Sequence, residues 1–418
     1  MISRRHVYHI GGYDPIAPEL MLERFCYSMS NFQDNWNVKG TVSNLNSSTN
    51  VSASWNAEAS GPNWKTITTI EMLRWDDLIL QDFERPPISR LLGGGHTLVD
   101  FIRTGTFVRY LRSSWRYTIF FVYPYMMVLL FAIAGLVAGY NASRLLGLSG
   151  IAGGALDLIV ALGLFAALMR WSPWSGRVQH AFDDWIFSRE FIYGSRSLMN
   201  RRLEEFAEII VARARAADTD EIVIVGHCLG AGLVMQTVAH ALKIDPQLCE
   251  HGPTICVLTV GATIPKFSLH PKGERTREAA LAVAGNRQVR WTEYHARNDL
   301  ISFYKFDPVT LKHIVPGQTD GRPNIRRVQM PDMMSKASFK KHRARFYRMH
   351  YQFLMANDLR AAYDYIMILC GPLPFDEITG AEGGLKRFTE IGAVIGPIEA
   401  INPAARPEMV LQSNVSAA

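Results

Sequence analysis

The stretch EIVIVGHCLGAG, residues 221–232, decides how the rest of the chain is interpreted. It begins with an apolar run that is typical of a buried strand in a parallel sheet. The run ends in Gly-x-Cys-x-Gly, and LVMQTVAHAL (233–242) then has the composition of a helix. A strand, a sharp turn between glycines and a helix would lift the central side chain, Cys228, above the end of the sheet.

The residues around Cys228 suit a nucleophile. Side chains at Gly226 and Gly230 would crowd the strand and the helix that converge there, so glycine is expected at both positions. The backbone N–H of Leu229, at the start of the helix, would face a developing oxyanion. The alternative interpretation is an ordinary buried thiol that happens to follow a strand.

Outside residues 96–175 the chain alternates between strand-like and helix-like segments. This alternation predicts an α/β fold with a mainly parallel sheet flanked by helices. Strands are expected at 7–12, 66–73, 222–226, 254–262, 289–296 and 325–330, helices at 19–32 and 197–216, and a polar extended region at 38–55.

With this pattern the sequence resembles the α/β-hydrolase superfamily. GHCLGA (226–231) is similar to the Gly-x-Ser-x-Gly box of that family, with cysteine in place of serine. The resemblance implies a second oxyanion donor in the loop after an early strand. HIGGYDP (9–15) occupies a matching place, which implicates Gly11 or Gly12 beside Leu229.

The resemblance also implies an acid after a late strand and a histidine last in chain order. Asp299 in HARNDLISF matches the first position, and His350 in FYRMHYQFLMAND matches the second. Four residues compete or stand close by: Asp307 is the alternative acid, His342 the alternative base, and His295 and His227 are expected to be structural.

Two long apolar runs interrupt the alternating pattern. Residues 118–139 carry no charge, and residues 145–169 carry only Asp157. Each run is long enough to cross a hydrocarbon core of about 30 Å as a helix. We therefore expect a transmembrane helical hairpin with YNASR (140–144) as its connection. Asp157 is expected to hydrogen-bond the neighbouring helix or to stay protonated, with a role in transport or proton relay as the less favoured alternative.

Close helix packing is expected from small residues spaced four apart, at Gly135 and Gly139 in the first run and at Gly150 and Gly154 in the second. Arginines precede and follow the hairpin, whereas its connection has only Arg144. The positive-inside rule then predicts a protein integral to the cytoplasmic (inner) membrane, with both termini and the hydrolase domain in the cytoplasm.

The expected division of the chain follows from these features. Residues 1–95 form the first part of the hydrolase domain. Residues 176–370 form the second part, which contains the Gly-x-Cys-x-Gly turn at 226–230, called the elbow below. Residues 96–175 hold the hairpin and, at 96–116, a basic amphipathic segment expected to lie on anionic headgroups. Residues 76–95 remain open as lid, linker or pocket wall, and residues 371–418 are expected to be a loosely attached tail.

Composition excludes several classes of protein. In 418 residues, 48% are hydrophobic, which is enough for a substantial core and too many for a disordered chain. The net charge of +6 is compatible with a membrane surface and is accounted for without nucleic acid. The five cysteines have neither a disulfide nor a zinc-ligand spacing, so no metal and no other cofactor is expected.

Three functions remain open for such a chain. The first is a membrane-anchored, lipase- or esterase-like hydrolase of acyl esters, thioesters or lipids, acting through a Cys-His-Asp triad and a covalent acyl-enzyme. The second is an acyltransferase, because polyhydroxyalkanoate synthases also have a Gly-x-Cys-x-Gly box in this fold. The third is a catalytically silent binding or scaffold protein. The substrate and the oligomeric state are not specified by the sequence.

Overall fold

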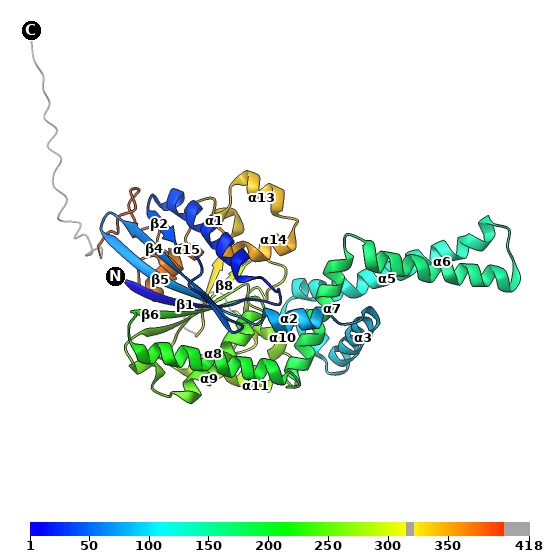
Figure 1. The fold of residues 1–418 in the computed structure, drawn as a ribbon, viewed down its shortest axis with the longest axis horizontal. Coiled ribbons are helices and arrows are strands. Elements are labelled where there is room, and N and C mark those ends of the chain that lie inside the picture. Colours follow the sequence, from blue (N-terminus) through cyan, green and yellow to red (C-terminus); the bar gives the residue numbers. More distant parts are fainter. Residues whose placement is uncertain (315–321, 397–418) are drawn as a thin grey trace, which may run out of the picture.

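The computed structural model describes residues 1–314 and 322–396. Within them a nine-stranded mixed sheet forms the centre of the molecule, with helices on both faces (Figure 1). In spatial order the strands are β11 (Asn324–Val328), β8 (Arg290–Ala296), β7 (Thr254–Val260), β6 (Glu221–His227), β1 (Arg4–Ile10), β5 (Trp64–Leu73), β4 (Ser52–Gly61) and β2 (Lys39–Val42), with β3 (Ser47–Ser48) paired to β4.

The strands from β11 to β5 pair in parallel, and β4 and β2 add an antiparallel edge. The expected α/β fold with a mainly parallel sheet is therefore present. Carboxyl ends of neighbouring parallel strands lie at the same edge of a sheet, where ligands of such folds usually bind. The β6 strand, which precedes Cys228, lies between β1 and β7 near the middle of this edge.

The continuous apolar run of β6 explains why helices cover both faces of the sheet. Ile222 and Ile224 belong to one core cluster, whereas Val223 and Val225 belong to the other. Successive side chains of a strand point to opposite faces, so a continuous apolar run needs a core on each side. These two cores are built by separate sets of helices.

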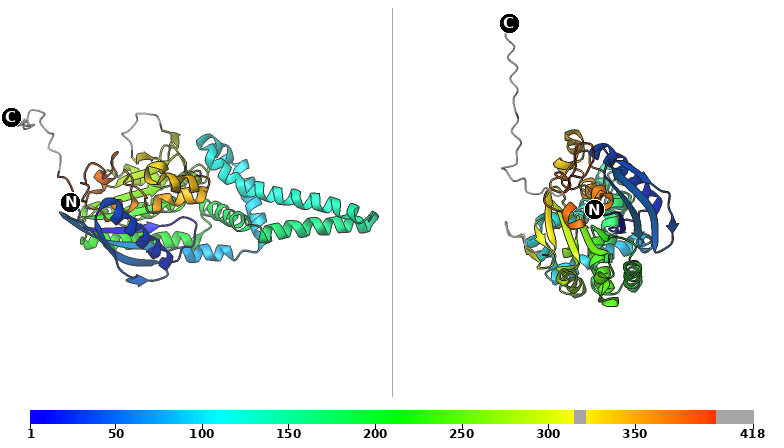
Figure 2. Two further views of the ribbon diagram at one scale, coloured as in Figure 1. Left: turned by 90° about the horizontal axis from the view of Figure 1, so that it is seen from above. Right: turned by 90° about the vertical axis from the view of Figure 1, so that its left-hand side faces the viewer.

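One face is covered by α8 (Ser197–Ala216), α9 (Gly230–Ile244) and α11 (Glu274–Gly285), and the other by α1 (Pro18–Trp36) and α15 (Tyr365–Cys370) (Figures 1 and 2). Shorter elements complete the domain: α10 (Ile264–Ser268), α12 (Met330–Met333), α13 (Lys336–His342), α14 (Phe346–His350), α16 (Phe375–Ile378), the 3-10 helices η1 (Leu248–Glu250) and η2 (Tyr351–Leu354), and the small β9 (Phe306–Asp307)–β10 (Lys312–His313) pair.

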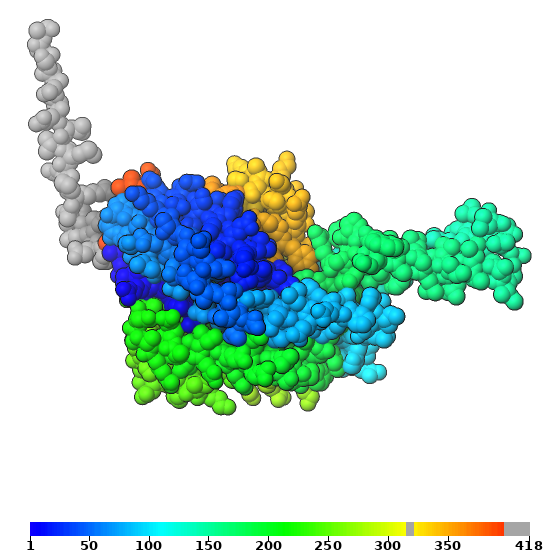
Figure 3. Space-filling model, viewed as in Figure 1, coloured from blue at the N-terminus to red at the C-terminus, as the bar shows by residue number. Residues whose placement is uncertain are grey.

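Helices α5 (Trp115–Leu145) and α6 (Gly150–Trp171) form an antiparallel hairpin that projects away from the domain (Figure 3). Both are long and apolar enough to cross a membrane, and most of their surface is not covered by protein. The first helix extends through YNASR, so the connection is at 146–149 and not at 140–144 as expected from the sequence.

Close packing of α5 against α6 explains the two glycines of α5, Gly135 and Gly139. A Cβ on Gly135 would lie 2.5 Å from the Ala161 carbonyl oxygen, and one on Gly139 would lie 2.3 Å from the Asp157 carbonyl oxygen. The expected pair Gly150 and Gly154 does not have this role, because a Cβ on either would meet nothing within 4 Å. Each of these two glycines therefore has space around it where a side chain would stand.

The Asp157 carboxylate has hydrogen-bond partners on the other helix. Its Oδ1 accepts the Ser143 N–H at 2.9 Å, and its Oδ2 accepts the Ser143 hydroxyl at 3.0 Å. These bonds tie α6 to the last turns of α5. They match the interhelical hydrogen bonding expected for this residue.

The segments that flank the hairpin are more closely packed than the sequence indicated. Residues 76–113 form α2 (Asp76–Phe83), α3 (Pro87–Arg103) and α4 (Thr106–Ser113). Phe101 and Tyr110 are fully buried in the protein core, whereas Ile102 and Leu111 are half exposed. Thus only part of the basic amphipathic segment is free to lie on a membrane.

The C-terminal segment also differs from the expectation of a loose tail as far as residue 396. Phe375 and Phe388 are buried, and the Arg5 guanidinium donates to the carbonyl groups of Gly371 and Leu373. Buried contacts of this kind hold the segment to the sheet despite its glycine and proline content. The remainder of the expected tail, 397–418, lies outside the described residues.

Candidate active site

Cys228 directly follows β6 and has a φ of 57°, in a left-handed region that non-glycine residues rarely adopt. Its N–H donates to the Val260 carbonyl at the end of β7 at 3.2 Å. Its carbonyl accepts N–H groups from Ala231 at 3.2 Å and Thr263 at 3.1 Å. The turn is therefore held from two sides, and unusual backbone geometry of this kind is often found at functional sites.

The two glycines of the elbow are required by close backbone contacts. A Cβ on Gly226 would lie 2.6 Å from the Cα of Ala231, at the start of α9. A Cβ on Gly230 would lie 2.2 Å from the Ile10 carbonyl oxygen and 2.4 Å from that of Gly11. Gly226 thus allows strand and helix to converge, whereas Gly230 makes room for the loop after β1.

Asp299 and His350 meet behind the elbow. Asp299 lies in the loop after β8, His350 ends α14, and both side chains are buried. The His350 Nδ1–H donates to Asp299 Oδ2 at 2.9 Å, while Asp299 Oδ1 accepts the Ile301 N–H at 2.9 Å. The carboxylate is therefore fixed and in turn fixes the orientation of the imidazole ring.

The charges around His350 favour its protonated form. Burial by itself lowers the pKa of His350, but the Asp299 carboxylate and the neighbouring Cys228 side chain outweigh this effect and raise that pKa to about 10. Burial acts to raise the pKa of Asp299. The neighbouring His350 imidazolium outweighs burial, so the pKa of Asp299 lies below its ordinary value. A carboxylate beside an imidazolium stabilises both charges.

The second ring nitrogen of His350 is free for chemistry. Nε2 is buried and has no hydrogen-bond partner among the described residues. Cys228 and His350 line the same pocket. Unpaired polar atoms are uncommon in protein interiors, and this one belongs to the ring that Asp299 orients. The arrangement can carry a proton between the ring and a group bound in the pocket.

The competing residues have other partners. Asp307 Oδ1 accepts the N–H groups of Val309 and Thr310 at 2.8 and 3.1 Å, as in a local turn. His295 contacts Glu293 at 2.6 Å through Nε2 and accepts the Lys305 N–H through Nδ1. His342 ends α13 and does not line the Cys228 pocket. Of the candidate pairs, the structure brings Asp299 and His350 together.

His227 contacts His350 and has a structural role. Burial lowers the pKa of His227 well below its ordinary value, so the ring is neutral. Its Nε2 lies 3.3 Å from the His350 carbonyl oxygen, and the two rings are 4.6 Å apart. A neutral ring can donate its Nε2–H to this carbonyl, which would hold the end of α14 against the elbow.

The loop after β1 reaches Cys228 because β1 and β6 are neighbours, with Ile10 opposite Gly226. A Cβ on Gly12 would lie 2.9 Å from the Cβ of Cys228, whereas one on Gly11 would meet nothing within 4 Å. Among the described residues, neither the Gly12 N–H nor the Leu229 N–H donates a hydrogen bond to the backbone. Of the two glycines, Gly12 is therefore the better oxyanion donor candidate.

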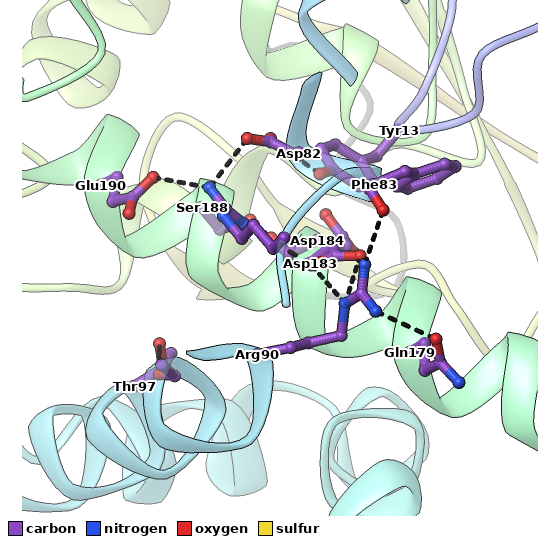
Figure 4. Close-up of polar contacts among 12 residues, drawn as sticks. Tyr13, Asp82, Phe83, Arg90, Thr97, Gln179, Asp183, Asp184, Ser188 and Glu190 are labelled. Atoms are coloured by element: carbon purple, nitrogen blue, oxygen red, sulfur yellow. Dashed lines mark hydrogen bonds and ion pairs between the residues drawn. The ribbon is translucent and has the colours of Figure 1, made fainter. Parts of the chain in front are cut away.

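The next residue of this loop, Tyr13, is anchored in a buried ionic network. Its hydroxyl donates to Asp82 at 2.8 Å, and its carbonyl oxygen lies 2.6 Å from His180 Nε2 on α7 (Ser175–Ile192). Beside it, Arg90 of α3 reaches Asp183 and Gln179 of α7 (Figure 4). The helix that follows the hairpin thus holds the loop after β1 in place.

A pocket of about 300 Å³ lies in front of Cys228 and His350. One wall comes from the base of α5, with Tyr117 and Phe120, and another from α7, with Asp184. The remaining side chains include Arg177, Thr263, Lys266 and Tyr347. The hairpin base and its following helix are therefore part of the site.

Lys266 places a buried positive charge in this pocket. Its Nζ donates to Asp184 Oδ1 at 2.6 Å and lies 4.1 Å above the Trp185 ring. Burial lowers the pKa of Lys266, and the Asp184 carboxylate opposes this effect. The pair adds charged hydrogen-bonding groups to the pocket that Cys228 lines.

No family model, curated protein or solved structure matches the chain. The interpretation of the site therefore rests on its own geometry.

Gly261 and Lys266 are among the site residues that sequence reasoning missed. Gly261 follows β7 with a φ of +54°, and a Cβ there would lie 3.0 Å from His350 Cε1 and 3.3 Å from Asp299 Oδ2. A glycine at the end of a strand is a usable signal for such a position, whereas nothing in the sequence around Lys266 marked it.

Proposed function

We propose that the chain is a membrane-anchored hydrolase of acyl esters or thioesters with an α/β-hydrolase-like fold. The proposal rests mainly on one arrangement. Cys228 stands at a left-handed turn after β6, in the same pocket as a histidine that is oriented by a buried carboxylate. A nucleophile, a base and a group that orients the base are the elements of covalent acyl transfer.

In the proposed acylation step the thiol proton resides on His350 Nε2, and Cys228 Sγ forms a bond to the acyl carbonyl carbon. The N–H groups of Gly12 and Leu229 donate to the oxyanion that develops on the carbonyl oxygen. The bond from the carbonyl carbon to the leaving oxygen or sulfur then breaks. The leaving alcohol or thiol takes the proton from Nε2.

In the proposed deacylation step water replaces the leaving group. His350 Nε2 accepts one proton as the water oxygen bonds to the carbonyl carbon. The carbon–sulfur bond breaks, and the fatty acid departs while Cys228 remains as a thiolate opposite the imidazolium. Asp299 keeps its hydrogen bond to Nδ1 throughout. No cofactor or metal takes part.

The membrane part of the proposal rests on α5 and α6 and on where they join the site. Phe120 at the base of α5 packs against Tyr347 of α14, with ring centroids 6.1 Å apart, and both line the pocket. An amphiphilic substrate at the bilayer surface would lie close to this pocket. The basic flanks of the hairpin favour a cytoplasmic active site at the inner membrane.

Mass spectrometry of the full-length protein in lipid nanodiscs tests the proposal. Incubation with an acyl thioester should add one acyl group to Cys228 and release free fatty acid. The Cys228→Ala variant should do neither. Cys26→Ala is the matched control, because Cys26 is an exposed thiol outside the pocket, and it should behave as wild type.

The products separate the alternative functions. Fatty acid as the main product in the presence of an alcohol acceptor supports hydrolysis, whereas a new ester indicates an acyltransferase. A protein that folds, neither acylates nor releases product, and leaves Cys228 unlabelled by acyl probes would contradict both enzymatic functions and favour a silent binding protein.

A further inference from the structure

A second pocket, of about 510 Å³, lies on the other side of the loop after β1 from the His350 pocket. It is bounded by α1, by the loop after β1 and by the α14–η2 segment. Its lining includes the apolar side chains of Ile16, Leu20, Met21, Phe25, Met72, Leu354 and Met355. A largely apolar pocket of this size can enclose most of a small hydrophobic ligand.

The two pockets adjoin at the nucleophile. Gly12, Asp14, Tyr347 and Tyr351 line both, and His227, next to Cys228 in the chain, lines the larger one. Between them the Tyr351 hydroxyl donates to Asp14 Oδ2 at 2.5 Å. This pair therefore lies where the two pockets adjoin, beside Gly12.

The α1 helix gives the larger pocket an apolar interior and a polar rim. Met21 and Phe25 are buried and line it, while Glu23 and Arg24, on the same helix, also line it but are exposed. A ligand that fits this arrangement has a hydrocarbon part that is withdrawn from water. A charged or strongly polar ligand would leave the buried side chains without suitable partners.

The position of His350 decides which part of a substrate occupies which pocket. The base must return its proton to the leaving group, so the leaving group has to lie on the side of the base. His350 lines the smaller pocket and does not line the larger one. The smaller pocket also carries Lys266 and Asp184, which suit a polar alcohol or thiol rather than a hydrocarbon chain.

We infer that the larger pocket holds the hydrocarbon chain of the acyl group, and that the substrates are long-chain acyl esters or thioesters whose polar leaving group occupies the smaller pocket. This inference rests on the proposed function. The acyl carbonyl lies between the pockets at Cys228, and the chain passes the Asp14–Tyr351 pair. The chain is thereby drawn away from the hairpin and under α1.

Filling the larger pocket tests the inference. With Met21→Trp, the kcat/KM for a palmitoyl thioester should fall about tenfold or more, while that for a butyryl thioester stays within about twofold, because a short chain leaves most of the pocket empty. Met21→Ala enlarges the pocket and should not cause the loss of palmitoyl activity that Met21→Trp causes. Leu92→Trp is the control, since Leu92 is 70% exposed on α3.

Equal losses for both chain lengths in Met21→Trp, or no loss for palmitoyl in a folded variant, would overturn the inference. Direct binding keeps the test independent of catalysis. A fluorescent fatty acid should bind the Cys228→Ala protein and bind about tenfold more weakly when Met21→Trp is added. If wild type hydrolyses no thioester, the proposed function fails, and this binding experiment alone decides whether the pocket takes the chain: weaker binding supports it, unchanged binding refutes it.

Discussion

The Asp299 carboxylate accepts a 2.9 Å hydrogen bond from His350 Nδ1, and neither group is exposed to solvent. The loop after β8 supplies one residue and α14 the other. Gly261, after β7, leaves just enough space for the pair to lie against the elbow. The pair determines how His350 titrates, and this leads to the first prediction.

Asp299→Asn should lower activity about 10²-fold or more and move the alkaline limit of the pH profile downward. In the native protein the pKa of His350 is raised to about 10. The imidazolium that serves as proton donor is therefore present at neutral pH and is lost as the pH rises through that value. Without the Asp299 charge the pKa moves back toward about 6.5. The pH dependence of kcat/KM for a short acyl thioester measures the shift.

The same pair has a consequence for stability. Because the folded-state pKa of His350 is raised, the pair stabilises the fold fully below the ordinary pKa, and this contribution is lost as the pH rises through about 10. The midpoint of urea unfolding should therefore fall between neutral pH and pH about 10 in wild type and fall less in Asp299→Asn. Parallel pH dependence in both proteins would mean that His350 is not the group that titrates.

Gly261→Ala should impair catalysis more than folding. The added Cβ would lie 3.0 Å from His350 Cε1 and 3.2 Å from Nδ1, and the φ of +54° disfavours alanine. The backbone strain costs about 1 kcal/mol, whereas displacement of the ring should lower kcat/KM about tenfold or more. Gly285→Ala, where a Cβ would meet nothing within 4 Å, is the matched control. A stable Gly261→Ala protein with full activity would show that the ring position is not critical.

Labelling with a membrane-impermeant maleimide tests the orientation of the hairpin. Ser149→Cys lies in the exposed connection between α5 and α6, whereas Cys26 is an exposed native thiol on α1. In intact cells expressing a Cys228→Ala background, residue 149 should be labelled and Cys26 should not. After permeabilisation both should react. Labelling of Cys26 in intact cells would contradict a cytoplasmic N-terminal domain.

The sheet could be predicted from the sequence because its buried strands are continuous apolar runs, as in β6 and β7. The elbow could be predicted as well, although only Gly226 has the expected local steric reason, the convergence of β6 and α9. Gly230 instead makes room for the distant loop after β1. Pairing of Asp299 with His350 was predicted only through chain order. That pairing depends on long-range packing of α14, which periodicity cannot specify.

Other features depended on tertiary contacts that leave no pattern in the sequence. The base of α5 and helix α7 form walls of the candidate site. From the sequence, the hairpin was expected only to interrupt the domain. The segment 76–95, left open as lid, linker or wall, lines neither pocket at the nucleophile. It forms α2 and part of α3, and Arg90 ties it to α7.

Arg90→Ala should destabilise the protein, by an amount toward the lower end of about 3–5 kcal/mol. The change removes the closer cationic partner of the buried Asp183 carboxylate and leaves Arg85, whose Nη1 lies 3.6 Å from Asp183 Oδ1. The Arg90 Nε lies 2.8 Å from Asp183, and the two side chains are only 7% and 1% exposed. Arg201→Ala is the control, since the Arg201 side chain is 69% exposed and its contact with Glu205 is 3.8 Å long; exposed pairs contribute about 0–1 kcal/mol. Chemical unfolding in detergent micelles measures both variants. Equal stability of the two would mean that Asp183 finds water or another partner, and the anchoring of the loop after β1 through α7 would then not depend on Arg90.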